Sequence, residues 1–196
     1  AGQPWDASYT DAPAPWDVGR PQQAIIRLAA ESAFAGDVLD VGCGSGENAL
    51  HLAGLGLNVL GVDVAATGIA MAREKARAGG EAEFAVADAL HLERLGRSFD
   101  TVLDCALLHT FDAAERRAYA SSLATVTRPE ATVHELCFSD IGTDLGPHPV
   151  SAEELRAVFA AWRVVSIEPE RLQTRFHERG APAWRARIEQ IARATW

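Results

Sequence analysis

The sequence has few of the residues that build disulfide frameworks or metal centres. Its three cysteines, Cys43, Cys105 and Cys137, are far apart in 196 residues, and no two form a CxxC pair. The six histidines are equally dispersed, without an HExxH pair. Disulfide scaffolds and structural zinc sites need closely spaced ligands. We therefore expect no bound metal, and cysteines that are reduced and partly buried beside predicted strands.

An excess of positive charge and long apolar runs are also lacking. The chain has 18 Lys and Arg against 27 Asp and Glu, which gives a net charge of −9. Such a chain repels the phosphates of nucleic acids and anionic lipids. No apolar run reaches the roughly 20 residues of a spanning helix, and the N-terminus has no basic-then-apolar signal pattern. We expect a cytoplasmic protein that binds neither nucleic acid nor membrane, either as a monomer or as a homodimer.

The patterns that are present alternate between strand and helix. Apolar spacing predicts a helix from Gln22 to Phe34, with Pro21 in its first turn. Strands are predicted at Asp37–Val41, Asn58–Val62, Glu83–Val86, Thr101–Asp104 and Thr132–Phe138. Further helices are predicted at Glu47–Leu55, Ala66–Ala78, Ala113–Val126 and Ala152–Ala160. Short apolar strands separated by helices indicate right-handed βαβ units and a parallel sheet covered on both faces. The length suits a single domain over residues 1–196.

The C-terminal part of the chain fits two patterns. Trp184, Ala186 and Ile188 alternate with charged residues, as in a strand, but Ile188 and Ile191 also match one face of a helix. We favour the strand. Just before this region, Ser151 is followed three residues later by Glu154, which is a capping box and predicts that a helix begins at Ala152.

The most informative stretch is a glycine-rich turn between a strand and a helix. It reads Val38-Leu39-Asp40-Val41-Gly42-Cys43-Gly44-Ser45-Gly46 and is followed by a helical pattern from Glu47. The glycines permit a tight turn and close approach of a ligand to bare backbone. Dinucleotide sites instead have GxGxxG and hold a pyrophosphate at the helix N-terminus. Asp40 and Glu47 would repel a pyrophosphate, so the sequence favours a cationic cofactor.

This stretch resembles motif I of the class I S-adenosylmethionine (SAM)-dependent methyltransferases, and three further segments in the same order match that family. They end in Asp63, Asp88 and Asp104. The resemblance implies an α/β fold with a doubly wound, mostly parallel, seven-stranded Rossmann-like sheet and an antiparallel edge strand. It also implies SAM as the cofactor and S-adenosylhomocysteine as the product.

The resemblance also assigns roles to the acidic residues. The loop after Asp40 would hold the methionine part, Asp63 the ribose hydroxyls, and Asp88 the adenine amino group. The cofactor-binding residues expected in this way are Trp16, Asp40, Val41, Gly42, Cys43, Gly44, Asp63, Val64, Asp88, Ala89 and Cys105. Alternatives stay open: Asp63 could be a helix cap, Asp88 a surface turn residue, and Asp104 either a cavity residue or a cap at the strand end.

On the acceptor side, His109 is the ionisable group that follows the fourth strand. We expect it to serve as the catalytic base or as a substrate contact, although a structural or capping role is the alternative. Phe111 is the next candidate substrate contact. The segment after Asp104 lacks the Asn/Asp-Pro-Pro-aromatic tetrad of the nucleic-acid amino-methyltransferases.

The N-terminal segment, residues 1–24, contains Ala14-Pro15-Trp16-Asp17-Val18-Gly19-Arg20-Pro21. This resembles the entry segment of small-molecule methyltransferases, which include the thiopurine, thiol and halide enzymes and the bacterial heterocyclic toxin methyltransferases. The resemblance implies that residues 1–24 form a lid over a core of residues 25–196, with Trp16 near the cofactor and Trp5 and Tyr9 against the substrate. Alternatively, Trp16 merely attaches a coil to the sheet.

Together these features predict an enzyme that methylates nitrogen, sulfur or oxygen of a small, flat, apolar molecule in bacterial secondary metabolism or detoxification. The alternatives are a protein or nucleic-acid methyltransferase, and a SAM-binding sensor without chemistry. One departure from the family precedes the fifth strand, where Arg128-Pro129-Glu130-Ala131 replaces a glycine-containing turn. Without glycine we expect this turn to avoid positive φ angles and to reshape the rim of the site.

Overall fold

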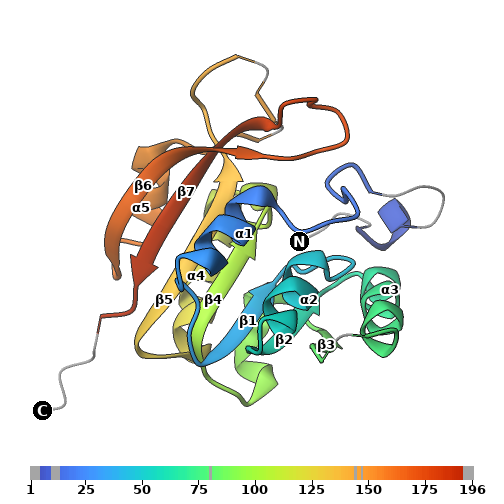
Figure 1. The fold of residues 1–196 in the computed structure, drawn as a ribbon. Coiled ribbons are helices and arrows are strands. Elements are labelled where there is room, and N and C mark those ends of the chain that lie inside the picture. The colour runs from blue at the N-terminus through green and yellow to red at the C-terminus, as the bar shows by residue number, and fades with distance from the viewer. Residues whose placement is uncertain (1–4, 10–13, 80, 144, 147, 192–196) are drawn as a thin grey trace, which may run out of the picture.

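The computed structural model describes residues 5–9, 14–79, 81–143, 145–146 and 148–191. Within them, seven strands form one sheet in the order β3-β2-β1-β4-β5-β7-β6 (Figure 1). The strands are β1 Asp37–Val41, β2 Asn58–Asp63, β3 Glu83–Val86, β4 Phe99–Cys105, β5 Thr127–Phe138, β6 Arg163–Leu172 and β7 Ala181–Glu189. The α-helices are α1 Gln23–Ala30, α2 Glu47–Gly54, α3 Ala66–Arg77, α4 Ala113–Val126 and α5 Ala152–Val158. Short 3-10 helices are η1 Trp5–Tyr9, η2 Ala89–Leu95 and η3 Leu108–Thr110.

The sheet is parallel from β3 to β5 and mixed beyond it. β1 pairs in parallel with β2 and β4, and the same holds for β2 with β3 and for β4 with β5. β7 runs antiparallel to both of its neighbours, β5 and β6. The predicted doubly wound, mostly parallel seven-stranded fold is therefore confirmed, and its antiparallel strand lies one position in from the β6 edge.

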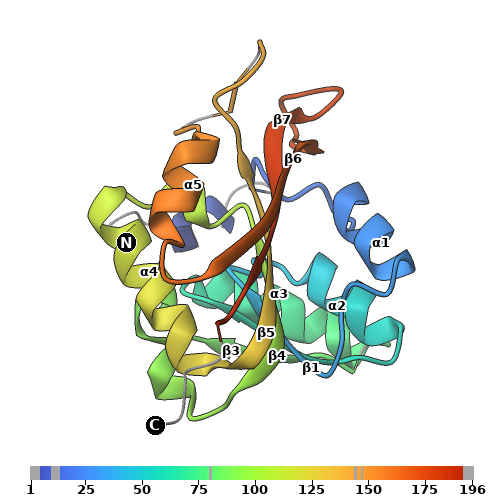
Figure 2. The same ribbon diagram turned by 90° about the vertical axis from the view of Figure 1, so that its left-hand side faces the viewer.

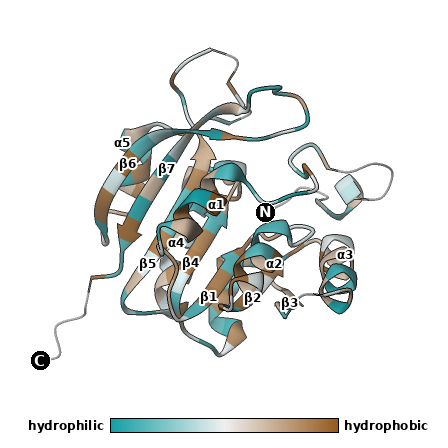
Figure 3. Ribbon diagram, in the orientation of Figure 1, coloured by the Kyte–Doolittle hydropathy of each residue, from teal (hydrophilic) through white to brown (hydrophobic). Residues whose placement is uncertain are grey.

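Helices cover both faces of the sheet, as Figure 2 shows with the sheet seen nearly edge-on. α1, α2 and α3 pack on one face, where Ile25, Leu52 and Ile69 meet Val38 and other strand residues. α4 and α5 pack on the other face, in a cluster that includes Tyr119, Leu123 and Leu155. Figure 3 shows hydrophobic residues along β4 and hydrophilic ones on α3. Strands buried on both faces explain the continuous apolar runs in the sequence.

Local signals set several element boundaries as predicted. The Ser151 hydroxyl accepts a hydrogen bond from the Glu154 amide, and the Glu154 carboxylate accepts one from the Ser151 amide. This capping box starts α5 at Ala152, and Asp112 with Glu115 starts α4 in the same way. The segment around Trp184 is strand β7, because it pairs on both sides. Among the described helices, none has both the length and the apolar character needed to cross a membrane.

Several predictions about local structure are wrong. β5 begins at Thr127 instead of Thr132. α1 ends at Ala30 instead of Phe34, and Gln22 is its N-cap, so Pro21 precedes the helix. Glu130 has a φ of +66°, so the turn without glycine does adopt the left-handed conformation. That turn also lies within β5, whose Arg128 forms ion pairs with Asp37 at the start of β1 and with Asp100 near the start of β4. It is thus at the amino ends of the strands and does not shape the rim of the site.

Candidate active site

A cavity of about 510 Å³ opens beside the carboxyl ends of the parallel strands. This is the edge at which open α/β sheets bind their ligands. The cofactor-binding residues predicted from sequence that line it are Trp16, Val41, Gly42, Asp63, Val64, Asp88, Ala89 and Cys105. All four predicted substrate contacts, Trp5, Tyr9, His109 and Phe111, line the same cavity. The topology therefore brings together residues that are up to a hundred positions apart in the chain.

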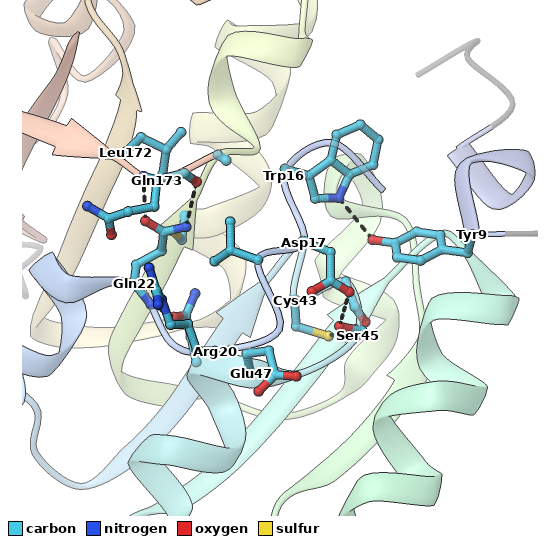
Figure 4. A pocket seen from close by; sticks show the side chains of 16 residues that line it. Tyr9, Trp16, Asp17, Arg20, Gln22, Cys43, Ser45, Glu47, Leu172 and Gln173 are labelled. Atoms are coloured by element: carbon cyan, nitrogen blue, oxygen red, sulfur yellow. Dashed lines mark hydrogen bonds between the residues drawn. The ribbon is translucent and has the colours of Figure 1, made fainter. Parts of the chain in front are cut away.

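A smaller and more polar pocket, about 60 Å³, adjoins this cavity and shares Tyr9, Trp16 and Gly42 with it (Figure 4). The predicted Cys43 and Gly44 line this pocket. Its polar walls come from three regions: the N-terminal segment, the start of α2 and the end of β6. These residues are Asp17, Arg20, Gln22, Ser45, Glu47, Asn48 and Gln173. None of these residues was predicted as a site residue, although Asp17, Arg20 and Ser45 stand within the two motifs described above.

The glycine-rich turn uses its own amides inside the protein. Gly42 and Cys43 donate hydrogen bonds to the Val62 carbonyl oxygen at 2.8 and 3.0 Å, and Gly44 donates to Asp63 Oδ2 at 2.8 Å. Gly44 has a φ of +55°, and a Cβ there would lie 2.7 Å from the Tyr9 hydroxyl oxygen. Because these three amides are already satisfied, the turn offers a pyrophosphate little of the amide cradle that binds it in dinucleotide sites.

Asp63 is both a structural cap and a cavity residue. Its Oδ2 accepts the Gly44 amide and its Oδ1 accepts the Ala65 amide, each at 2.8 Å. Burial raises the pKa of Asp63, and these two amides partly oppose that shift. Each carboxylate oxygen can accept more than one hydrogen bond. The pair can therefore still receive both hydroxyls of a vicinal diol, so the capping alternative and the ribose role are compatible.

Asp88 follows β3 and begins η2. Its Oδ1 accepts the Leu90 amide at 2.9 Å, which fixes the side chain as an N-cap. Asp88 and the next residue, Ala89, both line the large cavity. An N-cap carboxylate has spare lone pairs, and it can accept a hydrogen bond from an amino group in the cavity.

Asp40 does not reach either pocket. It is buried in β1, and neither carboxylate oxygen has a hydrogen-bond partner among the described residues. Burial raises the pKa of Asp40 to about 8, and the negative charges of Asp104 and Asp63 act in the same direction. A carboxyl group with this pKa is largely protonated at pH 7. The sequence predicted that a charged Asp40 lies beside the ligand. This prediction is wrong, because Asp40 is buried in β1 and lines neither pocket.

Asp104 organises the segment that carries His109. Its Oδ1 accepts the amides of Leu107 at 2.9 Å and Leu108 at 3.4 Å. Between them and the strand, Ala106 takes a φ of +74°, an uncommon conformation for a residue with a side chain. Burial raises the pKa of Asp104 to about 6. Its role is to cap the strand end and hold this turn, and it does not line the cavity.

His109 forms part of an aromatic wall at the acceptor end of the cavity. Its ring centroid lies 4.3 Å from that of Phe138, with an angle of 39° between the planes. Nδ1 is buried and has no hydrogen-bond partner among the described residues. Burial lowers the pKa of His109 to about 3, and the positive charge of Arg116 contributes. The imidazole is therefore neutral throughout the physiological range and is a weak base.

Aromatic residues of the N-terminal segment close another side of the cavity. Trp16 meets Trp5 and Tyr9 edge-on, with centroid separations of 5.7 and 6.2 Å, and its indole N–H donates to the Tyr9 hydroxyl at 3.1 Å. The segment is tied to the rest of the protein at several points, two of which involve its carboxylates. Thr67 donates to Asp6 through its amide and its hydroxyl, and the Ser45 hydroxyl donates to Asp17 Oδ2 at 2.6 Å. The segment thus lies over the glycine-rich turn.

The acceptor end also contains residues that the sequence did not single out. They are Phe138, which ends β5, His148 before α5, and Thr174, Phe176 and His177 between β6 and β7. No motif marks them, because only the pairing of β5, β7 and β6 brings their loops to this edge. Among the described residues that line the cavity there is no lysine or arginine, and Asp63 and Asp88 are the acids.

The turn with satisfied amides, the two acids at successive strand tips and the aromatic acceptor wall suit the chemistry of a SAM-dependent methyltransferase. The residues fit a nucleoside with a positively charged sulfonium: Asp63 suits the ribose diol, and the described lining residues of the cavity include no lysine or arginine. Residues 38–130 match the family model described as a methyltransferase domain.

Two named relatives support this class. The chain is 37% identical over 164 residues to 2-heptyl-1-hydroxyquinolin-4(1H)-one methyltransferase of Mycobacteroides abscessus. The aligned region covers 81% of this chain and 72% of that protein. It is 25% identical over 189 residues to thiocyanate methyltransferase 1 of Brassica oleracea, covering 92% and 84%. The chain belongs to the SAM-dependent methyltransferases and acts on a small molecule.

Solved structures agree. One, from work on the conversion of a disulfide bond into a thioacetal group during echinomycin biosynthesis, is 38% identical with a TM-score of 0.86, covering 96% of this chain and 88% of that one. Magnesium protoporphyrin IX methyltransferase from Synechocystis PCC 6803 with bound SAM shares the fold, at 22% identity and a TM-score of 0.65, covering 85% and 76%.

Proposed function

We propose that this enzyme methylates a nitrogen, sulfur or oxygen atom of a flat, uncharged aromatic molecule, in secondary metabolism or detoxification. The observation that carries the proposal is the acceptor end of the cavity. Phe111, Phe138 and the neutral imidazole of His109 line it, without a lysine or arginine among the described lining residues. A carboxylate or phosphate on the acceptor would lose its hydration there without gaining a lysine or arginine among the described lining residues as a partner. A hydroxyquinolone, as in the name of the mycobacterial relative, fits these walls.

The aromatic wall would fix the plane of the acceptor. The Phe138 ring packs against the His109 ring, and the backbone at Gly146 approaches it so closely that an added Cβ would lie 2.4 Å from it. Stacked rings hold a planar ligand in one orientation. Methyl transfer needs the nucleophile in line with the sulfonium carbon, so orientation and exclusion of water are what the protein contributes. SAM itself supplies the activated methyl group.

His109 would orient the acceptor and would not carry its proton. A conjugate acid with a pKa of about 3 makes the imidazole too weak a base to remove a proton from a phenol near ~10. With Nδ1 buried, Nε2 is the nitrogen left to hydrogen-bond with an acceptor oxygen or nitrogen. Acceptors with a low pKa, such as thiols near ~8.5, would ionise without help.

The cofactor would lie across both pockets. Its ribose would bind Asp63 and its adenine would lie beside Asp88 and Ala89, while Val41, Val64 and Cys105 would contribute contact surface. The methionine end would occupy the smaller pocket between Gly42, Cys43 and Gly44, where Arg20 is the cation that can pair with a carboxylate. Asp40 would act from behind the turn, without direct contact.

Residues 1–24 would form a lid over the core of residues 25–196, all within a single domain. Trp5, Tyr9 and Trp16 line the cavity, and their mutual contacts support a closed arrangement. The net charge of −9 supports an enzyme that avoids nucleic acid and anionic membranes. A cytoplasmic location and a monomeric or homodimeric state complete the proposal.

The test compares neutral and charged acceptors of the same shape. The purified chain and SAM are incubated with 4-methylthiophenol or 4-mercaptobenzoate, and with 1-hydroxyquinolin-4(1H)-one or its 3-carboxylate, and S-adenosylhomocysteine release is measured. We expect kcat/KM to be at least about tenfold higher for each neutral member, since an unpaired buried charge is costly. Equal rates, or a preference for the carboxylates, would overturn the proposed acceptor class.

A further inference from the structure

Phe176 is an aromatic residue that lines the cavity and yet remains largely exposed. Its exposed fraction is 77%, the highest among the large hydrophobic residues that the structure describes. It lies in the loop of residues 173–180 between β6 and β7. This loop and the segment between β5 and α5 rise together above the sheet in Figures 1 and 2.

Phe176 is exposed although hydrogen bonds hold the turn that carries it. The Thr174 hydroxyl oxygen accepts the amides of Phe176 at 3.3 Å and His177 at 3.1 Å, and it also bonds His177 Nδ1 at 2.7 Å. The loop is anchored at its start, because Gln173 and Gln22 exchange hydrogen bonds at 2.8 and 2.9 Å. The protein thus holds this ring at the mouth of the cavity and leaves its apolar surface uncovered.

The neighbours of Phe176 restrict what can cover it. Arg175, Glu178 and Arg179 are exposed in the same loop, which Figure 3 shows as largely hydrophilic. Protein interfaces and membrane-binding surfaces need contiguous apolar patches of several hundred Å². Within its loop Phe176 is a single ring among charged residues, which is too small for either. The Phe176 ring is large enough to contact a ligand group of a few carbon atoms that extends out of the cavity beside it.

We propose that Phe176 is a specificity-determining residue that binds an apolar substituent of the methyl acceptor. The inference rests on the proposed function. The reacting ring lies against His109 and Phe138, and an alkyl or aryl substituent extends from it through the mouth of the cavity to cover the Phe176 ring. The acceptor is therefore elongated, with its nucleophile at one end and an apolar tail at the other.

The experiment measures how affinity depends on tail length. Thiophenols with hydrogen, methyl, propyl or pentyl in the para position, and 1-hydroxyquinolin-4(1H)-ones with the same groups at position 2, serve as acceptors for wild type, Phe176→Ala and Phe176→Leu. In the wild type we expect KM to fall about two- to fourfold for each added methylene that is buried. Phe176→Ala should flatten this dependence, so that its KM departs from the wild-type value most for the longest tail and least for the unsubstituted acceptors. Phe176→Leu should retain most of it.

The matched control is Leu55→Ala, another exposed large hydrophobic residue, at the end of α2 and outside both pockets. It should leave the dependence on tail length as in the wild type. A dependence that is the same in Phe176→Ala and wild type would overturn the proposal. So would a Phe176→Ala effect confined to self-association in sedimentation equilibrium or to binding of phosphatidylcholine vesicles.

A binding measurement separates this proposal from the proposed function. Para-alkylphenols are titrated into the complex with S-adenosylhomocysteine by calorimetry, which does not depend on turnover. If no acceptor is methylated but phenol affinity rises with tail length in wild type and not in Phe176→Ala, the proposed reaction fails and the Phe176 site stands. If affinity does not rise with tail length in the wild type, the Phe176 proposal is wrong whatever the turnover.

Discussion

Asp63 Oδ2 accepts the Gly44 amide at 2.8 Å and so joins the tip of β2 to the glycine-rich turn after β1. The same carboxylate caps the Ala65 amide and lines the cavity. Ligand binding and local structure therefore share one side chain, and a substitution there tests both.

Substitution of Asp63 should weaken cofactor binding more than it weakens the fold. In Asp63→Asn the side chain keeps an acceptor oxygen but loses its charge. We expect the dissociation constants of SAM and S-adenosylhomocysteine to rise about tenfold or more, since hydrogen bonds to charged groups contribute about 1.5–3 kcal/mol. Calorimetric titration measures this. Glu74→Gln, an exposed acid on α3, is the control; unchanged affinity in Asp63→Asn would remove Asp63 from the site.

Protonation of Asp40 should make stability depend on pH. Its pKa is about 8 in the folded protein against 3.8 as the ordinary value, so the folded state retains a proton that the unfolded state loses. The free energy of unfolding should then fall as pH rises from about 4 to about 8, by up to ~1.4 kcal/mol per unit from this group. Asp40→Asn should flatten the slope in urea melts at pH 5, 6, 7 and 8. An equal slope in both proteins would contradict a buried, protonated Asp40.

The pH dependence of turnover should follow the acceptor and not His109. Two thiophenols whose pKa values differ by a unit are compared from pH 5 to 9. We expect the inflection of kcat/KM to move with the thiol, because burial keeps His109 neutral over this range. His109→Phe should lower kcat/KM about tenfold for oxygen acceptors and less for thiols, with SAM affinity unchanged. An inflection at a fixed pH that vanishes in His109→Phe would identify the histidine as a base.

The hydrogen bond between Trp16 and Tyr9 should couple the N-terminal segment to cofactor affinity. Tyr9→Phe and Trp16→Phe each remove one partner of a bond of 3.1 Å, and the double variant completes a cycle. We expect each single change to raise the SAM dissociation constant about two- to tenfold, and the double change to cost less than their sum. Strict additivity would show that the two residues act independently.

Trp184→Phe offers a contrasting effect on stability alone. The Trp184 indole N–H donates to the buried Val150 carbonyl oxygen at 2.9 Å, and its loss leaves that carbonyl without this partner. We expect the free energy of unfolding to fall by about 1–3 kcal/mol, with SAM affinity within twofold of the wild type. Denaturant melts and calorimetry check the two parts. A large loss of SAM affinity would mean that β7 affects the cofactor site.

Much of the fold could be predicted because its signals are local. The boundaries of β1, β3 and α4 follow from apolar runs, a glycine-rich turn and an N-cap, and they match the structure. The positive φ of Glu130 could not be predicted in this way, because the register of β5 and the ion pairs of Arg128 hold that turn. Tertiary contacts there outweigh the local preference of the residue.

The cofactor half of the site was more predictable than the acceptor half. Asp63 and Asp88 stand at strand ends within short motifs, so sequence order alone places them at one edge. Phe138 ends β5 and Phe176 lies in the loop after β6. Both belong to the mixed side of the sheet, whose pairing order no local pattern specifies. For Asp40 the motif could be recognised from sequence, but the burial of the side chain could not. That burial depends on how α2 and the glycine-rich turn pack around it.

The internal bonding of the glycine-rich turn has a consequence for catalytic turnover. Since Val62 and Asp63 already hold its amides, the floor of the nucleoside site keeps its shape whether or not a nucleoside is there. The entropic cost of ordering the glycine-rich turn therefore arises once, during folding, and not again each time a nucleoside binds. We therefore expect exchange of S-adenosylhomocysteine for SAM to depend on movement of the N-terminal segment that carries Trp5 and Trp16, and not on reordering of this turn.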